Sequence, residues 1–310
     1  MNNYSHIPVL FNEVITLLQP QANGRYLDGT VGAGGHTAGI LEASAPTGRV
    51  LGLDKDPEAI AYAQKRLAKY GERVILINAS YTAMAQVAAA HGFTDLDGIL
   101  LDLGLSSRQL DDPARGFSFM KEGPLDMRFD PTQGETAADL INNLSEAELA
   151  DIFWRYGEEN RSWYYARIIV AERPFTRTTE LADVIAANTR QRGRRHPATK
   201  IFQALRIAVN KELEAVETGV MAAIDLLKPN GRLAVISFHS LEDRFVKQTF
   251  RRLSQDKTPP PGFPATDDSR PAIVRRITRK AMQATAAETE QNPRSRSARL
   301  RVIEKLEIRD

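Results

Sequence analysis

The sequence has 310 residues, of which 42% are hydrophobic and 26% are charged, so the chain can bury a large core and hold two domains. It contains no cysteine, which excludes disulfides, thiolate metal sites and every mechanism that attacks through a thiolate. The net charge of +2 is an average over regions of opposite sign. The N-terminus has no basic and apolar leader, and no run approaches about 18 apolar residues, so we expect a cytoplasmic protein without a membrane span.

The first strong pattern joins a strand to a glycine-rich turn. A short amphipathic helix is expected over residues 11–18, and it is followed by the apolar pair Tyr26 and Leu27, then Asp28, then four glycines between positions 29 and 35. This order predicts a buried parallel strand, a tight turn and a helix over residues 36–42. Such a turn brings backbone N–H groups against a polar or anionic ligand, and glycine permits the close approach.

A second buried strand, residues 49–54, ends in Asp54 about 20 residues beyond the glycines. In a doubly wound fold that carboxylate accepts hydrogen bonds from ribose hydroxyls, so we expect a ligand that contains adenosine. Asp28, beside the first glycine, favours a ligand with an ammonium group over one with a second phosphate. S-adenosylmethionine fits this description, and a nicotinamide dinucleotide is the alternative.

The strand and helix alternation continues to residue 102. Asp56 and Pro57 are typical of a helix start, and the helix is expected over residues 57–70. Strands are expected over residues 73–78 and 96–102. Tyr81, just after the first of these, either lies against an adenine ring or packs in the core. Asp102 ends the second strand, where the carboxyl ends of parallel strands meet the ligand crevice.

The alternation then stops for roughly a hundred residues. Residues 111–130 look like a long ordered loop, and helical spacing follows in four segments, residues 145–156, 163–172, 178–190 and 200–218. The alternation resumes with a helix over residues 221–227, a strand over residues 232–240 and a helix over residues 241–253. Two strands, residues 272–278 and 298–306, suit a closing antiparallel pair. We therefore predict an α/β fold, a doubly wound and mostly parallel Rossmann-like sheet with an inserted α-helical domain.

Basic residues gather in two regions, which suggests a polyanionic partner. Residues 161–211 hold eleven Lys and Arg against three acids, and residues 244–310 hold sixteen against eight. We expect RNA to contact the helical insertion and the C-terminal region through Arg192, Arg194, Arg195, Arg294, Arg296 and Arg299.

Several motifs are longer and more specific than a fold requires. They are DGTVGAGGH (28–36), LDLGLSSRQLD (101–111), RGFSF (115–119), PLDMR (124–128), HPAT (196–199) and SFHSLEDR (237–244). With these motifs the chain resembles, nearly end to end, the bacterial ribosomal RNA small subunit methyltransferase H family.

The resemblance implies an enzyme that uses S-adenosylmethionine to methylate N4 of a cytidine in the decoding region of 16S ribosomal RNA in the small ribosomal subunit. It places the cofactor contacts at Gly34, Gly35, His36, Asp54, Tyr81, Asp102 and Gln109. It also implies a methyltransferase domain over residues 1–108 and 219–310 and an inserted substrate-recognition domain over residues 109–218. The sequence does not determine the oligomeric state, and a homodimer is one possibility.

The chemistry needs an aligned amine and an acceptor for its proton, because the N4 lone pair of cytosine is delocalised into the ring. Asp102 is the first candidate for the proton acceptor, and Ser106 and His239 are the next candidates. The two prolines and the aromatic ring that often follow such an acid are absent, so Phe117, Phe119 or Phe238 would hold the flipped base. The five histidines are scattered and there is no cysteine, so no metal site is expected. The alternative function is a non-catalytic RNA-binding or assembly protein that senses a nucleoside.

Overall fold

The computed structural model describes residues 8–189, 196–257 and 271–307, and of Ser107 the backbone alone. The chain divides into two compact units: residues 1–104 with 214–310 form unit 1, and residues 105–213 form unit 2.

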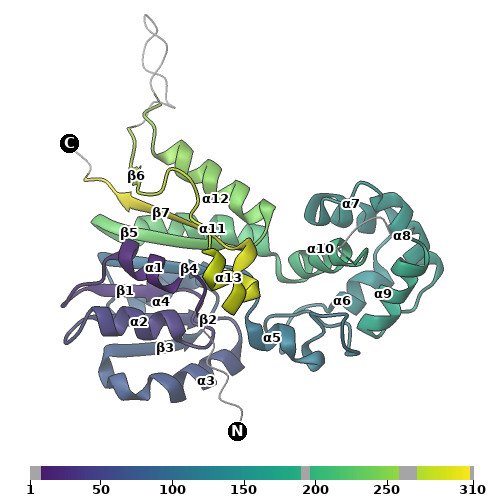
Figure 1. Ribbon diagram of the computed structural model, residues 1–310, viewed down its shortest axis with the longest axis horizontal. Helices are drawn as coiled ribbons and strands as arrows, with labels where there is room; N and C mark the ends of the chain where they lie inside the picture. Colours follow the sequence, from purple (N-terminus) through teal and green to yellow (C-terminus); the bar gives the residue numbers. More distant parts are fainter. Residues whose placement is uncertain (1–7, 190–195, 258–270, 308–310) are drawn as a thin grey trace, which may run out of the picture. The chain divides into compact units, whose positions relative to one another are not determined.

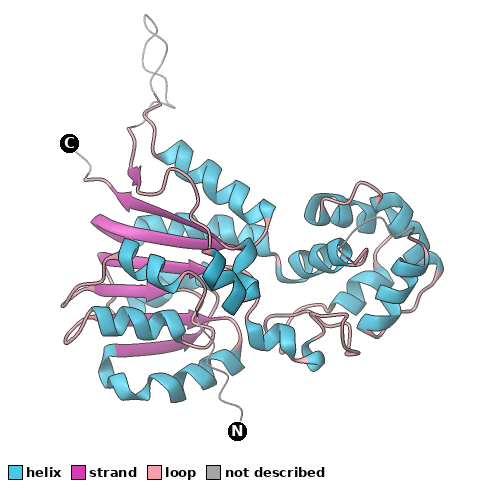
Figure 2. Ribbon diagram, in the orientation of Figure 1, coloured by secondary structure: helices cyan, strands magenta, loops and turns pink. Residues whose placement is uncertain are grey.

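Unit 1 is built on one seven-stranded sheet in the order β3-β2-β1-β4-β5-β7-β6 (Figures 1 and 2). Strands β1 to β5 run parallel, and β7 pairs antiparallel with both β5 and β6. The strands are β1 (Arg25–Asp28), β2 (Arg49–Asp54), β3 (Val74–Asn78), β4 (Leu96–Asp102), β5 (Leu227–Ser237), β6 (Val274–Arg276) and β7 (Arg299–Lys305). The predicted α/β class, with its mostly parallel Rossmann-like sheet, is confirmed.

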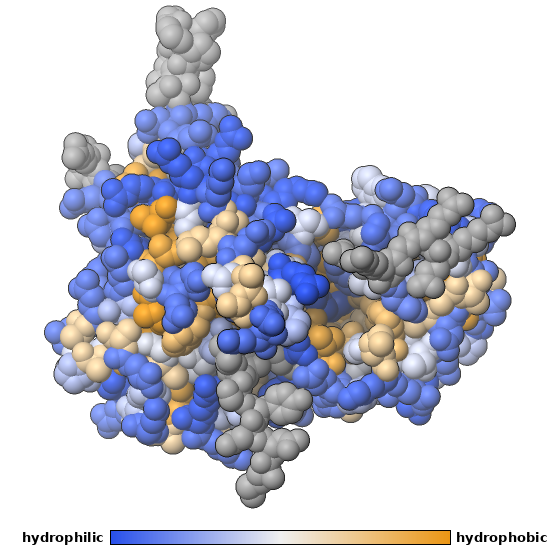
Figure 3. Space-filling view, in the orientation of Figure 1, coloured by the Kyte–Doolittle hydropathy of each residue, from blue (hydrophilic) through white to orange (hydrophobic). Residues whose placement is uncertain are grey.

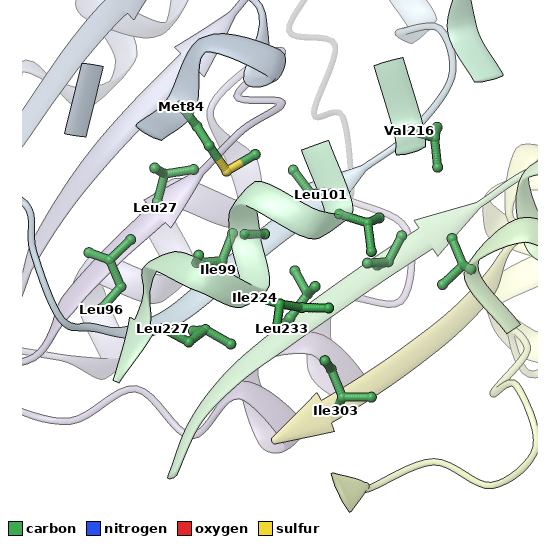
Figure 4. Packing of buried hydrophobic residues seen from close by; sticks show 14 of the residues in the cluster. Leu27, Met84, Leu96, Ile99, Leu101, Val216, Ile224, Leu227, Leu233 and Ile303 are labelled. Carbon is green, nitrogen blue, oxygen red and sulfur yellow. The ribbon is translucent and has the colours of Figure 1, made fainter. Parts of the chain in front are cut away.

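Helices cover both faces of this sheet, which explains why its central strands are continuously apolar. The helices of unit 1 are α1 (Phe11–Leu18), α2 (Gly35–Ala43), α3 (Pro57–Leu67), α4 (Met84–Ala90), α11 (Glu212–Leu226, which begins at the end of unit 2), α12 (Ser240–Leu253) and α13 (Ala286–Gln291). Successive side chains of a strand point to opposite faces, and the core divides accordingly. Leu27 and Leu101 pack with Met84 of α4 and Ile224 of α11 (Figure 4). Leu51 and the buried residues of α12 belong to the same cluster. Val50 and Leu100 pack with α1 and α2 on the other face.

Unit 2 is helical and has a hydrophobic core of its own. Its helices are α5 (Ser107–Asp111), α6 (Ala137–Asn143), α7 (Glu146–Gly157), α8 (Ser162–Ala171), α9 (Thr178–Ala187) and α10 (Thr199–Asn210). A capping box of Ser145 and Glu148 begins α7, the helix expected over residues 145–156. The expected ordered loop is held by Asn210, whose side chain accepts from the N–H of Phe129 at 2.8 Å and donates to the carbonyl of Met127 at 2.8 Å.

The prediction of one helix over residues 200–218 and another over residues 221–227 was wrong. The chain breaks at Lys211, which has φ 51° and ψ 44° and whose N–H donates to the carbonyls of Ala208 and Ile207. Beyond this left-handed residue α11 runs without interruption through Gly219 to Leu226. Helix α6 was not predicted either. The Pro-rich segment 258–264 lies outside the described residues.

Hydrophilic residues cover most of the face shown in Figure 3. Within the described residues, no helix has the length and apolar character needed to cross a membrane.

Candidate active site at the carboxyl ends of the parallel strands

The glycine-rich turn after β1 is shaped by two residues in the left-handed region. Gly32 has φ 51° and Gly34 has φ 76°, where a side chain would be strained. The N–H of Gly34 donates to the carbonyl of Val31 at 2.7 Å, and Gly34 caps helix α2. Gly35 has a different reason, because a Cβ there would lie 2.4 Å from Cγ of Pro8.

Asp54 ties the end of β2 to this turn. Its Oδ2 accepts from the N–H of Gly32 at 2.7 Å, and its Oδ1 accepts from the N–H of Asp56 at 2.8 Å. Burial raises the pKa of Asp54 to about 6 against the effect of these two hydrogen bonds, and the charges of Asp56 and Asp28 raise it further. Each carboxylate oxygen still has a lone pair, so Asp54 can accept from a pair of hydroxyls.

Asp28 braces the turn from inside the fold. It is 1% exposed. Its Oδ2 accepts from the hydroxyl of Thr37 at 2.6 Å, and its Oδ1 accepts from the N–H of Thr30 at 3.1 Å. Burial raises its pKa to about 6. The sequence-based interpretation of Asp28 as a partner for a ligand ammonium overlooked these two threonines, which already engage both oxygens.

Asp102 carries an unused acceptor. Its N–H donates to the hydroxyl of Thr30 at 2.7 Å, which fixes the end of β4 beside the end of β1. Its Oδ1 is buried and, within the described chain, has no hydrogen-bond partner. Burial raises the pKa of Asp102 well above its ordinary value, and the negative charges of Asp28 and Glu242 raise it further. A buried acceptor left unpaired costs roughly 1–3 kcal/mol, so a donor supplied by a ligand would recover that energy.

His36 faces the other oxygen of Asp102. The carbonyl of Val9 accepts from Nε2 of His36 at 3.0 Å, so Nε2 carries hydrogen and Nδ1 is the nitrogen that faces Asp102. Nδ1 lies 3.6 Å from Oδ2. The imidazole is 6% exposed and stacks on Phe11, with 6.2 Å between the ring centroids. The orientation of His36 is thus set by its surroundings.

Tyr81 follows β3 and packs against α11. A Cβ added to Gly219 would lie 2.3 Å from Cδ2 of Tyr81, so the ring occupies the space that this glycine leaves. Tyr81 also borders Gly29, whose Cβ would lie 3.0 Å from that of Tyr81. The Tyr81 ring is partly buried and packs against the hydrophobic core beside the glycine-rich turn.

His239 and Phe238 follow β5. His239 caps α12: its Nδ1 accepts from the N–H of Glu242 at 3.4 Å, while Glu242 Oε2 accepts from the N–H of Phe238 at 2.9 Å. Nε2 of His239 is buried and lies 3.1 Å from Oε1 of Glu242, without the alignment of a hydrogen bond. Phe238 borders Gly104 and packs on the core face that holds α1 and α2.

Four of the predicted site residues belong to unit 2. Ser106 and Gln109 form a capping box at the start of α5: the N–H of Ser106 donates to Oε1 of Gln109 at 2.9 Å, and the N–H of Gln109 donates to Oγ of Ser106 at 3.2 Å. Phe117 stacks on Phe129 at 5.7 Å. Phe119 contacts the rings of His196 and Phe202 at 4.7 and 4.8 Å. Both phenylalanines therefore contribute to the core of unit 2.

The basic residues expected to bind RNA divide into three groups. Arg192, Arg194 and Arg195 lie outside the described residues. Arg294 and Arg296 lie in the short 3-10 helix Pro293–Ser297. Arg299 begins β7 and lies 3.1 Å from Asp243, so it is partly committed to the fold.

Sequence reasoning missed the residues that hold the acids in place. Thr30 contacts both Asp28 and Asp102, and Thr37 supplies the shortest hydrogen bond to Asp28. Glu242 is 1% exposed and contributes to the high pKa of Asp102. Hydroxyl residues inside and just after the glycine-rich turn were the available signal for the two threonines.

Comparisons with known proteins agree over nearly the whole chain. The family model described as the MraW methylase family matches residues 3–306. Curated relatives at about 50% identity carry the name Ribosomal RNA small subunit methyltransferase H. That of Thermomicrobium roseum is 52% identical over 97% of this chain and 94% of its own length. Those of Syntrophobacter fumaroxidans and Geotalea uraniireducens are 52% and 50% identical, covering 97% and 99% of this chain and 96% and 100% of theirs.

Proposed function

This chain belongs to the MraW methylase family, and on that premise we propose that it uses S-adenosylmethionine to methylate N4 of a cytidine in the decoding region of 16S ribosomal RNA. It is an S-adenosylmethionine-dependent ribosomal RNA methyltransferase. The observation that supports this site best is the buried Oδ1 of Asp102, an acceptor at the end of β4 for which the described chain supplies no donor.

The residues at the carboxyl ends of β1, β2 and β4 fit this cofactor. Asp54 has two carboxylate oxygens with spare lone pairs for the ribose hydroxyls. The turn at Gly32 and Gly34 exposes backbone without a Cβ, and helix α2 begins directly behind it. Tyr81 adds an aromatic ring at the end of β3. We propose that Gly34, Gly35, His36, Asp54, Tyr81, Asp102 and Gln109 form the cofactor site.

S-adenosylmethionine, when bound, supplies a methyl group on a positively charged sulfonium. The amine that receives this methyl must lose a proton as its new N–C bond forms. Asp102 has a mixed role in this proposal: it positions the cofactor, and its carboxylate accepts the amine proton directly or through water. His36 borders that carboxylate on one side, with Nδ1 3.6 Å from Oδ2, and leaves the unpaired Oδ1 for the substrate side. Ser106 and His239 are the next candidates for contact with the amine.

The substrate context follows from the same premise. We propose that the chain acts in the cytoplasm on 16S ribosomal RNA assembled into small subunits, with unit 2 as the substrate-recognition domain. Because such a target is recognised by its folded shape, small subunits should be methylated faster than a short hairpin of the same sequence. Whether the active form is a monomer or a homodimer is decided by light scattering at assay concentration.

Transfer of labelled methyl groups from S-adenosylmethionine tests the function. Small subunits from cells that lack this protein are incubated with it, and the modified nucleoside is mapped by mass spectrometry. The expected product is one N4-methylated cytidine in the decoding region. RNA that binds tightly without gaining label would instead support the alternative, a non-catalytic RNA-binding protein that senses a nucleoside.

A further inference from the structure

The basic residues of the C-terminal half of unit 1 serve two different purposes. The arginines of one group form ion pairs with acids of the same unit: Arg301 is 8% exposed and lies 2.8 Å from Asp243, and Arg232 lies 3.1 Å from Glu304. Arg275 and Arg299 join the same two acids. These arginines connect β5, β6, β7 and α12, so their number says little about a polyanionic partner.

Helix α12 carries the second group. Its buried side consists of Val246, Thr249, Phe250 and Leu253, which are at most 4% exposed and pack toward the sheet. Arg244, Lys247 and Arg251 are spaced three and four residues apart, which places them in one row on the opposite side, and all three are exposed. At 1.5 Å per residue this row is about 10 Å long.

The charges on the outer side of α12 are strongly unbalanced. From Arg244 to Lys257 there are five cations, Arg244, Lys247, Arg251, Arg252 and Lys257, all exposed, and the only acid in that range is Asp256. The two earlier acids of the helix, Glu242 and Asp243, are 1% and 5% exposed and face the fold. Among the described residues, no ion pair neutralises Lys247 or Arg251.

A hollow of about 400 Å³ continues this row at the end of the helix. It is lined by Gln248, Arg251, Arg252, Gln255, Asp256 and Lys257. Guanidinium groups and side-chain amides are the donors that commonly contact phosphate and sugar oxygens. The hollow is lined by the last turns of α12 and the residues that follow it, and none of the acids at the carboxyl ends of β1, β2 and β4 lines it.

We propose that the outer side of α12 and the four residues after it, from Arg244 to Lys257, form a second RNA-binding surface, which holds the phosphate backbone of the ribosomal RNA through unit 1. This inference rests on the proposed function for the identity of the polyanion. The physical basis is counterion release: each phosphate neutralised by a fixed cation releases bound salt ions, so binding weakens as salt rises. A row of cations on a rigid helix holds backbone without reading bases, which suits a site that positions a target for chemistry elsewhere.

The test removes two of the cations and compares a matched pair elsewhere on the same unit. Lys247→Gln/Arg251→Gln changes the proposed surface. Lys65→Gln/Lys69→Gln removes the same charge from α3 and its following turn, beside β2 and β3 at the other edge of the sheet. All four side chains are exposed, and both variants are checked for unchanged melting temperature.

Binding to a labelled 16S ribosomal RNA transcript is measured between 50 and 300 mM salt. The slope of log affinity against log salt should become shallower by about 1.4 to 1.8 for Lys247→Gln/Arg251→Gln, since a slope of about 0.7 to 0.9 belongs to each phosphate contact. The α3 pair should keep the parent slope, and calorimetric affinity for S-adenosylmethionine should be the same in all three proteins.

Equal slopes for the α12 pair and the parent would overturn the proposal, and so would an equal loss in the α3 pair, which would indicate net charge rather than a surface. Failure of the proposed function has a different signature. If the parent transfers no methyl group to small subunits while the slopes still separate the two pairs, the RNA-binding surface stands and the assigned reaction does not.

Discussion

Replacing Asp102 by Asn tests the central residue of the proposed site with little change in volume. Oδ1 of Asp102 is buried without a partner, and Oδ2 lies 3.6 Å from Nδ1 of His36. A hydrogen bond to a charged group contributes about 1.5–3 kcal/mol, which corresponds to a loss of roughly 10-fold to 100-fold in cofactor affinity. If the carboxylate also accepts the amine proton, the rate at saturating cofactor should fall by about 10²-fold or more.

The effect on stability has the opposite sign and separates a site defect from misfolding. Asp102 is repelled by Asp28 and Glu242, and burial raises its pKa well above the ordinary value. Removing that charge relieves the repulsion, so the free energy of unfolding of Asp102→Asn should not fall. Asp97→Asn, at the opposite end of the same strand, where Asp97 is half-buried and accepts from the N–H of Arg25 at 2.8 Å, is the control and should leave cofactor affinity unchanged.

The assay pairs calorimetric titration with S-adenosylmethionine and single-turnover methylation of small subunits at saturating cofactor. Weaker binding with a full rate would restrict Asp102 to the cofactor and move the search for an amine partner to Ser106 and His239. If Asp102→Asn had the same cofactor affinity and the same single-turnover rate as the parent, the argument from the unpaired Oδ1 would be refuted.

Three further predictions concern the cofactor, the core and a helix end. Asp54, with a pKa of about 6, must be ionised to accept from both ribose hydroxyls, so calorimetric cofactor affinity should rise between about pH 5 and 7 and then level; in Asp54→Asn the affinity should be lower and the profile flat. Gly219→Ala should destabilise unit 1 in denaturant titration although alanine favours helices, because its Cβ would lie 2.3 Å from Tyr81; a gain in stability would contradict the packing. Lys211→Gly should raise the free energy of unfolding by up to about 1 kcal/mol, since Lys211 has φ 51°; a measured loss would mean that the lysine side chain stabilises the break.

Strands β1 to β4 were predictable because each is a short, mainly apolar run that ends in a polar residue. Strands β2 and β4 have the predicted bounds, Arg49–Asp54 and Leu96–Asp102. The predicted N-cap of α3 is also found, with Asp56 accepting from the N–H of Glu58 at 2.9 Å. Local sequence patterns are sufficient to predict an element when its apolar residues and its capping residue both indicate the same structure.

The break between α10 and α11 had no such signal. Lys211 is a good helix former with no glycine or proline beside it, and only its left-handed backbone separates the two helices. Asp28 shows a related limit, because an acid at a strand end looks the same in sequence whether or not a threonine of the fold donates to it. Likewise, a count of arginines cannot separate Arg301, bonded to Asp243 in the interior, from Arg251 on the surface. In each of these cases the outcome depends on contacts with residues far away in the sequence, and a local sequence pattern does not contain that information.

The position of unit 2 in the chain also bears on how the protein folds. Strands β4 and β5 are hydrogen-bonded neighbours, yet all of residues 105–213 are synthesised between them. Bringing the two strands together across an unstructured chain of that length costs about 2 kcal/mol more than across a ten-residue connection, because closure entropy grows with the logarithm of length. An insertion with its own core can fold first and convert the long loop into a rigid connector. Pulse-labelled hydrogen exchange during refolding would then show unit 2 protected before the seam between β4 and β5.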